Sequence, residues 1–198
     1  MSLKKRTDLE RELLEVAQEG FNRPETKSFR DDVASHIRSG FLQVALSDQK
    51  PVAFAVSQLY PEKGAAYLAG LVKKPSAPSA LVERMVGQFI DQFDPTILIT
   101  RTQNDRVMEI MCRFCPRVVP LDRLATPQEV ELLTELGLMG ETTNPDLLIT
   151  RGHYGNQMIL GSQRRRSFNK RVTNFSDRLN YQAGDAALLI GYRKKYEK

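Results

Sequence analysis

The sequence has few of the residues that build metal centres or redox sites. Its only cysteines are Cys112 and Cys115, and its only histidines are His36 and His153. A structural zinc site needs four ligands, and neither histidine has the spacing of a zinc motif. Both cysteines fall near the C-terminus of a predicted helix, where the helix dipole opposes a thiolate. We therefore expect packed, unreactive thiols and no metal site.

Long apolar runs are also absent. No run approaches the roughly 20 residues that span a bilayer. The charged start of the chain, MSLKKRTDLERE, lacks the apolar segment of a secretion signal. The 198 residues, 41% hydrophobic and 27% charged, are typical of a globular protein, without repeats or low-complexity tracts. We expect a single domain over residues 1–198 and a cytoplasmic location.

The segment 41–74 has the pattern of three consecutive β-strands. The run FLQVALSDQKPVAFAVSQLY, residues 41–60, holds two apolar stretches on either side of the turn residues 48–51. The run AAYLAGLVKK, residues 65–74, follows at hairpin distance, and Pro75 ends it. The pattern predicts an antiparallel sheet of three strands.

The apolar period changes after Pro78, which we expect to be the first residue of a helix because proline has no N–H group to leave unbonded. The predicted buried face of this helix has apolar residues at helical spacing: Leu81, Met85, Val86, Phe89, Ile90 and Phe93. A short buried strand follows at residues 96–100. Asn104 is a good N-cap for a second helix. The predicted buried face of that helix comprises Val107, Met108, Ile110, Met111 and Phe114.

This order of hairpin, strand, helix, strand and helix resembles the core of the GNAT acyltransferase superfamily over residues 41–116. The resemblance implies a mixed α/β (α+β) fold with a mostly antiparallel central sheet and helices on both of its faces. It also implies that the third strand and the start of the following helix bind acetyl-coenzyme A. The next strand would splay away to admit the pantetheine arm.

The phosphate-binding segment departs from the family pattern. Family members carry Arg or Gln and then Gly-x-Gly or Gly-x-Ala, whose N–H groups hold the pyrophosphate with help from the helix dipole. This chain has VKKPSAPSA at residues 72–80, without glycine, and each proline removes a donor. By resemblance, the residues that would hold the pyrophosphate are Lys73, Lys74 and the N–H groups near Ser79, Ala80 and Leu81. The strand edge at Leu71 and Val72 would pair with the pantetheine amides.

Catalytic residues of the family are not matched. In many members the second helix carries a tyrosine that protonates the departing thiolate, and Met111 stands at that position here. Asn104 matches the family residue beside the cofactor arm, although Asn is also a leading N-cap residue regardless of function. Spacing singles out no catalytic residue. The side chains that could take a proton from an attacking amine are Glu62, Asp105, His153 and Tyr154.

The remaining segments flank this core. The sequence Thr7-Asp8-Leu9-Glu10 has the form of a capping box, which predicts a helix through about Glu19, and a second helix is expected from Ser28 to before Gly40. These predict a helical N-terminal part over residues 1–40, and the family's first strand would be absent or replaced. Residues 117–145 are interpreted as a helical insertion, opened by a capping box at Thr126 and ended by Gly137. Residues 146–198 hold two late strands, PDLLITR and AALLIGYRK.

Positive charge is concentrated between these late strands and at the chain end. Residues 1–150 carry a formal charge of −3 and residues 151–198 carry +8. Phe168, Val172, Phe175 and Leu179 recur at helical spacing in this region. The other faces of the predicted helix carry basic residues: Arg164, Arg165, Arg166, Lys170, Arg171 and Arg178. Such a basic amphipathic helix suits coenzyme A phosphates, a nucleic-acid backbone, or an acidic protein or membrane surface, and it is also typical of a solvated face.

Two functions follow from these observations. The first is an acyl-CoA-dependent N-acyltransferase that acts on an unidentified amine, either a small molecule or a protein. The second is a catalytically inactive GNAT-like binding module, whose basic helix binds an anionic partner such as non-specific nucleic acid. The strand and helix order and Asn104 favour the first, whereas the missing glycines and Met111 favour the second.

Overall fold

The computed structural model describes residues 3–155 and 166–193. Two compact units divide the chain between Pro95 and Thr96. We call residues 3–95 the N-terminal unit, and residues 96–155 with 166–193 the C-terminal unit. The single domain over residues 1–198 stays a prediction. No helix in the described part of the chain is both long and apolar enough to cross a membrane.

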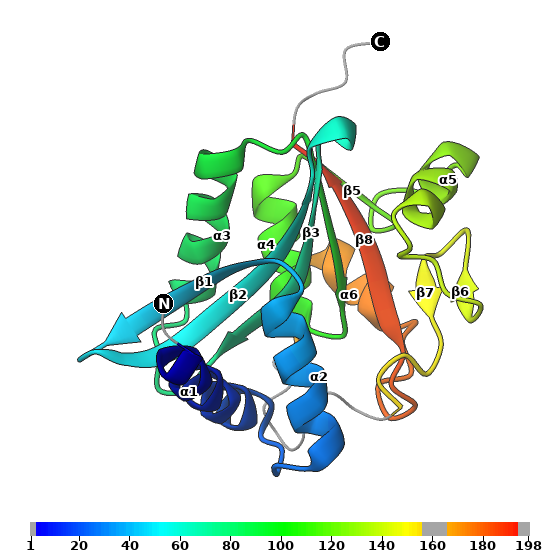
Figure 1. Ribbon diagram of the computed structural model, residues 1–198. Helices are drawn as coiled ribbons and strands as arrows, with labels where there is room; N and C mark the ends of the chain where they lie inside the picture. Colours follow the sequence, from blue (N-terminus) through cyan, green and yellow to red (C-terminus); the bar gives the residue numbers. More distant parts are fainter. Residues whose placement is uncertain (1–2, 156–165, 194–198) are drawn as a thin grey trace. The chain divides into compact units, whose positions relative to one another are not determined.

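The N-terminal unit contains the three predicted strands as an antiparallel sheet (Figure 1). They are β1 (Phe41–Ser47), β2 (Lys50–Tyr60) and β3 (Ala65–Lys73). Asp48 and Gln49 form the tight turn between β1 and β2, both with positive φ, which is the backbone of a type I′ turn. The short helix η1 (Pro61–Lys63) connects β2 to β3. The predicted hairpin and third strand are confirmed.

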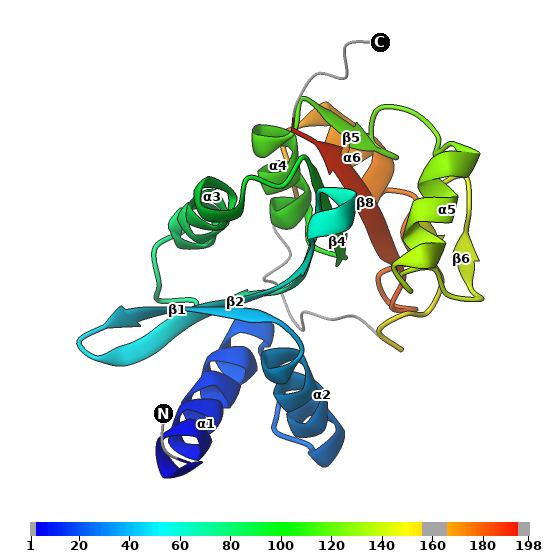
Figure 2. The ribbon, with the colours of Figure 1, turned by 45° about the horizontal axis from the view of Figure 1, so that its top comes forward.

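Helices cover both faces of this sheet (Figure 2). One face packs against α1 (Leu3–Phe21) and α2 (Lys27–Arg38), and the other packs against α3 (Leu81–Phe93). The split follows from strand alternation, because successive side chains point to opposite faces. The larger cluster, on the α1 and α2 side, has as its most buried members Leu13, Val16, Ala17, Phe54, Val56 and Val72.

The three helices of this unit do not begin where the sequence predicted. Helix α1 already includes the predicted cap at Thr7, because the Leu, Lys and Arg residues before it are good helix formers. The N-cap of α2 is Thr26, whose hydroxyl accepts the Phe29 N–H at 3.2 Å, and not Ser28. Helix α3 begins at Leu81 and not at Pro78, because a turn forms first, in which the Leu81 N–H donates to the Pro78 carbonyl at 3.1 Å.

The C-terminal unit is built around a central strand, β8 (Ala186–Tyr192), all seven residues of which are buried. It pairs antiparallel with β4 (Ile97–Thr102), and also with the short strands β5 (Arg117–Val119) and β7 (Ile149–Thr150). Strand β6 (Thr143–Asn144) pairs with β7. Burial on both faces explains the continuous apolar run AALLI in β8.

Three helices complete the C-terminal unit, and the sequence predicted a helix in each of these segments. They are α4 (Asp105–Phe114), α5 (Pro127–Glu135) and α6 (Lys170–Ser176). The capping box of α5 is confirmed, with Thr126 and Glu129 bonding reciprocally. The predicted insertion also contains strands β5 and β6.

The prediction of a late strand in PDLLITR is mostly wrong. Only Ile149–Thr150 is a strand in this segment. The Asn144 side chain accepts the backbone N–H groups of Asp146 at 3.0 Å and Leu147 at 2.7 Å, so it closes a turn there. Leu148 then has a positive φ of 49°, which interrupts the extended backbone.

Candidate functional site

The end of β3 presents backbone groups on the side away from β2. The Lys74 N–H donates to the Val52 carbonyl at 2.9 Å, and Val72 is paired with Phe54. Because inward and outward groups alternate along an antiparallel strand, Leu71 and Lys73 direct their N–H and C=O groups toward the opposite edge of β3. Val72 instead bonds to β2, and its side chain is buried in the α1 and α2 cluster. Of the two predicted edge residues, Leu71 has the outward geometry and Val72 does not.

A bulge lies shortly before this point in β3. Val56 pairs with Gly70 and Ser57 pairs with Leu68, so that Ala69 has no partner on β2. Such an extra residue bends a strand and re-aims the residues beyond it. The bulge therefore sets the direction in which Leu71 and Lys73 leave the sheet.

The two lysines that follow β3 make hydrogen bonds within the N-terminal unit. The Lys73 ammonium donates to the carbonyls of Lys74 at 3.1 Å and Ala77 at 2.9 Å, and its burial lowers the pKa of Lys73. The Lys74 ammonium is 2.7 Å from a carboxylate oxygen of Glu19 in α1. Both positive charges therefore lie at the predicted loop, each already held by an oxygen of the protein.

The start of α3 has the predicted small residues in the open. Ser79 and Ala80 are exposed, and Ala80 is the N-cap residue but provides no side-chain hydrogen bond. The side chain of Leu81 packs against the sheet. A helix N-terminus without a side-chain cap keeps its positive dipole end available to an anion.

Gly20 fixes the position of α1 against the end of β3. A Cβ atom at this position would lie 2.7 Å from the Lys73 carbonyl oxygen and 2.7 Å from a methyl group of Val72. Real side chains do not approach backbone this closely, so only glycine allows the observed contact. The same helix carries Glu19, and α1 therefore positions both the strand end and the partner of Lys74.

In the C-terminal unit, Asn104 is confirmed as the N-cap of α4. Its side-chain oxygen accepts the Arg106 N–H at 2.9 Å, and its own N–H donates to the Thr102 hydroxyl at 2.8 Å. The side-chain NH₂ group makes no hydrogen bond to the described residues. Capping therefore uses the oxygen of Asn104 and leaves its donor group unused in that part of the chain.

Position 111 lies in the core of the C-terminal unit. Met111 is 1% exposed, and its methyl group would lie 2.9 Å from a Cβ atom placed on Gly191 of β8. A thioether has no proton to give. At the position where the resemblance implies a proton donor, this chain has a side chain that packs α4 onto β8.

A polar cluster surrounds the start of α4. Asp105 is 3% exposed, and its carboxylate accepts the Ser167 N–H and the Tyr181 hydroxyl, each at 3.1 Å. The Ser167 hydroxyl donates to Glu109 at 2.5 Å. Both carboxylate oxygens of Asp105 thus bind segments far along the chain, which is the geometry of a structural tie.

The other predicted bases lie apart from this cluster or at the surface. The Tyr154 hydroxyl donates to the Arg101 carbonyl at 3.3 Å, and the exposed ring of His153 packs edge-on against Tyr154. Glu62 is exposed on η1 in the N-terminal unit. His153 and Tyr154 thus lie against each other, and Glu62 belongs to the other unit.

The cysteines are packed as predicted. Cys115 is fully buried against Gly191, and burial raises the pKa of its thiol to about 12. Burial also raises the pKa of Cys112. Burial thus favours the protonated form of both thiols.

The predicted basic helix is much shorter than expected. Helix α6 begins only after Asn169, whose side chain accepts the Arg171 N–H at 3.0 Å. Val172, Phe175 and Leu179 are buried as predicted, but Phe168 precedes the helix and is 90% exposed.

Two of the described basic residues around α6 form ion pairs. Arg171 bonds to Asp122 at 2.5 Å, and Arg166 pairs with Asp177. Arg164 and Arg165 lie outside the described residues. These ion pairs offset the positive charge of Arg166 and Arg171.

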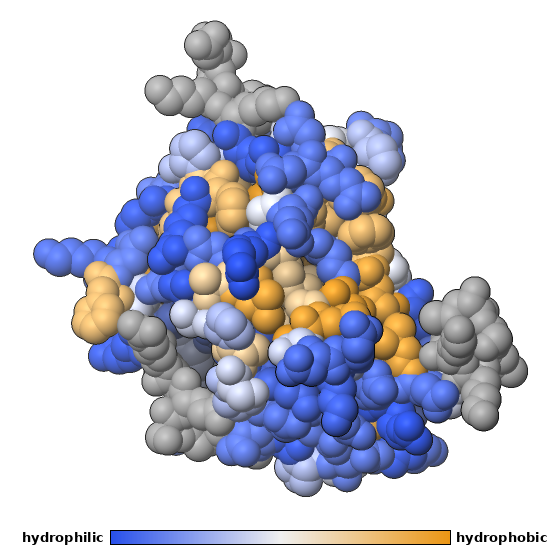
Figure 3. Space-filling model, turned by 90° about the vertical axis from the view of Figure 1, so that its left-hand side faces the viewer, coloured by the Kyte–Doolittle hydropathy of each residue, from blue (hydrophilic) through white to orange (hydrophobic). Residues whose placement is uncertain are grey.

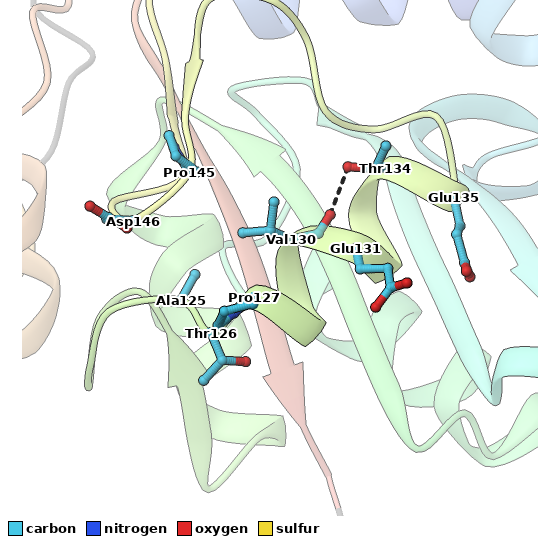
Figure 4. Close-up of a pocket in the computed structure, with 9 residues that line it drawn as sticks. All are labelled: Ala125, Thr126, Pro127, Val130, Glu131, Thr134, Glu135, Pro145 and Asp146. Carbon is cyan, nitrogen blue, oxygen red and sulfur yellow. Dashed lines mark hydrogen bonds between the residues drawn. The ribbon is translucent and has the colours of Figure 1, made fainter.

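An open pocket of about 470 Å³ lies beside α5. Figure 4 shows Glu131 and Glu135 on the helix, with Pro145 and Asp146 on the loop beside it. Sequence reasoning did not predict this pocket, because the loop meets the helix only in the folded chain. Its carboxylates are exposed.

Comparison with known proteins supports the fold. No family model and no curated protein sequence matches the chain. The solved structure of Tetrahymena GCN5 aligns with a TM-score of 0.51 at 12% identity, covering 71% of this chain and 84% of that one. The ribosomal-protein-S18-alanine N-acetyltransferase of Escherichia coli aligns at 16% identity with a TM-score of 0.47. The alignment covers 95% of this chain and 89% of that one. The chain has the predicted GNAT fold.

Proposed function

We propose that this protein binds an acyl-coenzyme A at the end of β3 and the start of α3 and transfers the acyl group to an amine. The observation that carries the proposal is the arrangement within the N-terminal unit. There, outward backbone groups, two lysine ammonium groups and an uncapped helix N-terminus follow one another within residues 71–81. The GNAT fold supports this chemistry, although a fold alone does not determine a function.

The donor set suits a diphosphate. Ammonium groups and helical N–H groups are the donors that proteins use for phosphate oxygens. Lys73, Lys74 and the backbone at Ser79 to Leu81 would hold the pyrophosphate. Leu71 and Lys73, with their outward N–H and C=O groups, would pair with the pantetheine amides, as one strand pairs with another.

Anion binding here requires an exchange of partners. The Lys74 ammonium must leave or share Glu19, and Lys73 must turn from the Ala77 carbonyl. The Leu81 N–H must likewise leave or share the Pro78 carbonyl. A glycine-rich loop binds phosphate through its backbone N–H groups. In this chain, which lacks those glycines, the lysine side chains would take over these contacts. We therefore expect weaker binding than a glycine loop gives, with a strong dependence on salt.

The coenzyme would supply an activated thioester, so the chain itself needs only to orient it and accept a proton from the attacking amine. Met111 gives no proton to the leaving sulfur. The strand edge at Leu71 and Lys73 would fix the arm. We assign no general base.

Thermal denaturation with acetyl-CoA tests the binding step. A ligand that binds only the folded state raises the melting temperature as its concentration increases. We expect the double variant Lys73→Met/Lys74→Met to lose about tenfold in affinity, and Glu19→Gln to gain affinity because Lys74 is released. Lys50→Met, which removes an exposed lysine at the hairpin, is the matched control. No shift at millimolar acetyl-CoA, or equal effects in all variants, would overturn the proposal.

A catalytically inactive binding module is the second candidate, and the buried Met111 favours it. Transfer to a panel of small amines and basic peptides separates the two functions once coenzyme binding is established. Acyl transfer that the Lys73→Met/Lys74→Met variant reduces supports the enzyme. Binding without transfer to any amine supports the module. Affinity for duplex and single-stranded nucleic acid at low salt then tests the anionic partner.

A further inference from the structure

Strand β1 has one edge that the described residues leave open. It pairs with β2, and its other edge receives no backbone hydrogen bond from the described part of the chain. Native proteins protect such edges with charge, proline or a covering segment, because unpaired backbone groups attract another strand. The sequence of β1, FLQVALS, contains neither a charged residue nor proline.

The outward groups of β1 can be identified from the pairing of β2. Val52 and Phe54 bond toward β3, so the alternate residues Ala53 and Ala55 bond toward β1. The close approach of the Ser57 carbonyl to Gly40, just before β1, agrees with this alternation. The partners of these inward groups are Phe41, Gln43 and Ala45, and the N–H and C=O groups of Leu42, Val44 and Leu46 therefore point to the open edge.

This set of outward residues is symmetric about Val44. If a second β1 lies antiparallel with Val44 opposite Val44, Leu42 of each copy lies opposite Leu46 of the other. Every outward group then meets an outward group, which gives about six hydrogen bonds. A two-fold axis requires just such a self-complementary surface.

The side chains beside this edge agree with the same register. Leu42 and Val44 pack into the cluster under α1 and α2, and Leu46, on the same face by alternation, is 56% exposed. The side of the molecule drawn in Figure 3, toward which the β1–β2 hairpin projects in Figure 1, has apolar residues between hydrophilic areas. Pairing about Val44 would place each exposed Leu46 against Leu42 of the other copy.

We propose that two copies of this chain associate through antiparallel pairing of their β1 strands, centred on Val44. The neutral sequence of β1 brings no like charges together, and the symmetric set of outward groups favours a second copy over an unrelated strand. One strand pair with a leucine contact at each end is a small interface. We therefore expect a dissociation constant on the order of 1–100 µM, as for weak, reversible dimers.

Sedimentation of the full chain over a range of concentrations tests the association. We expect Leu46→Lys to raise the dissociation constant at least tenfold, because two lysines would be placed on one small interface. Leu124→Lys is the matched control, since Leu124 is also 56% exposed but lies in the C-terminal unit. A wild-type chain that stays monomeric at several hundred micromolar, or equal effects of both variants, would overturn the proposal.

Disulfide trapping tests the register. In the proposed pair the two residues at position 44 have Cα atoms about 5.5 Å apart, within the range of a disulfide. We expect Val44→Cys to form a covalent dimer on mild oxidation. Ser47→Cys is exposed, yet its two copies would lie roughly 20 Å apart and should stay unlinked. Equal trapping of both, or none at position 44 under conditions where the wild type dimerises, would exclude this register.

Discussion

Different interactions stabilise the interior of each of the two units. Among the described residues, the N-terminal unit buries a single polar side chain, Ser57, whereas the C-terminal unit buries ten, including the carboxylates of Asp105, Glu129 and Asp185. The N-terminal unit has long strands between helices, and apolar packing suffices there. In the C-terminal unit, β6 and β7 have two residues each.

Each buried carboxylate fastens segments that have little regular structure. Glu129 accepts two hydrogen bonds from Arg123, one from the Thr126 N–H at 2.8 Å and one from the Tyr192 hydroxyl at 2.5 Å. Asp185 accepts the N–H groups of Gly152 at 3.1 Å and Asn180 at 3.0 Å, and pairs with Arg151. The comparison teaches that buried carboxylates can replace the backbone hydrogen bonds of a sheet where strands are short. This requires that each carboxylate accepts hydrogen bonds at both of its oxygens.

The largest effect should come from removing one of these carboxylates. We expect Asp185→Ala to lower the free energy of unfolding by about 3–5 kcal/mol, because two backbone N–H groups and Arg151 lose their acceptor. Asp177→Ala removes an exposed ion pair with Arg166 and should cost less than about 1 kcal/mol. Urea denaturation measures both. Similar losses for the two variants would mean that buried charge does not hold the C-terminal unit.

The corresponding substitution in the N-terminal unit is apolar. Leu13 is fully buried under β2 and β3, so Leu13→Ala should cost about 3 kcal/mol through lost burial and the cavity that remains. Leu59→Ala, at 36% exposure, is the control and should cost well under half as much. The loss at Leu13 should be insensitive to salt and to mild acid. A marked pH dependence of that loss would break the contrast between the units.

Acid should destabilise the C-terminal unit first. Burial alone would raise the pKa of Glu129, but hydrogen bonds from Arg123 and Tyr192 outweigh it and hold the pKa below its usual value; the same holds for Asp185 through Asn180, Gly152 and Arg151. A carboxyl with a lowered pKa stabilises the fold above about pH 4, and this stabilisation is lost as pH falls through the folded-state pKa. Amide exchange at decreasing pH should show β8 losing protection before β2. Simultaneous loss would contradict this.

The smallest expected effect concerns His36 in α2. A hydrogen bond that the His36 ring donates to the Asp32 carboxylate raises the pKa of His36 above its usual value of 6.5. The protonated pair therefore stabilises the fold slightly below about pH 6.5, and this contribution is lost as pH rises through the raised pKa. NMR titration of the His36 ring should give a value above that of a free histidine, and Asp32→Asn should return it toward normal. An unchanged pKa in the variant would show that Asp32 is not the cause.

Local sequence pattern predicted the N-terminal unit better than the C-terminal one. The alternation of β1 to β3 and the buried face of α3 are signals within one segment, and the tertiary structure agrees with them. Failures arose where two local signals competed. Thr7 resembled a cap although helix formers precede it, and Asn144 stopped a strand that the apolar run PDLLITR favoured.

The candidate site shows the same limit. The sequence located Lys73 and Lys74 next to a helix N-terminus, which needs only chain order. It gave no sign that Glu19, 55 residues away, pairs with Lys74. Likewise, nothing local links Asp105 to Tyr181 or Glu129 to Tyr192, because hydrogen bonds between distant segments leave no periodicity in a single sequence.

The contact between α4 and β8 has a consequence for anyone who wants to redesign this protein. Gly191 leaves room beneath α4 that Cys115 and Met111 fill completely. A tyrosine installed at position 111 would have its ring in that space and its hydroxyl away from water. Met111→Tyr alone should therefore destabilise the fold without providing a usable proton donor. Such a donor would be better introduced on another helix or strand.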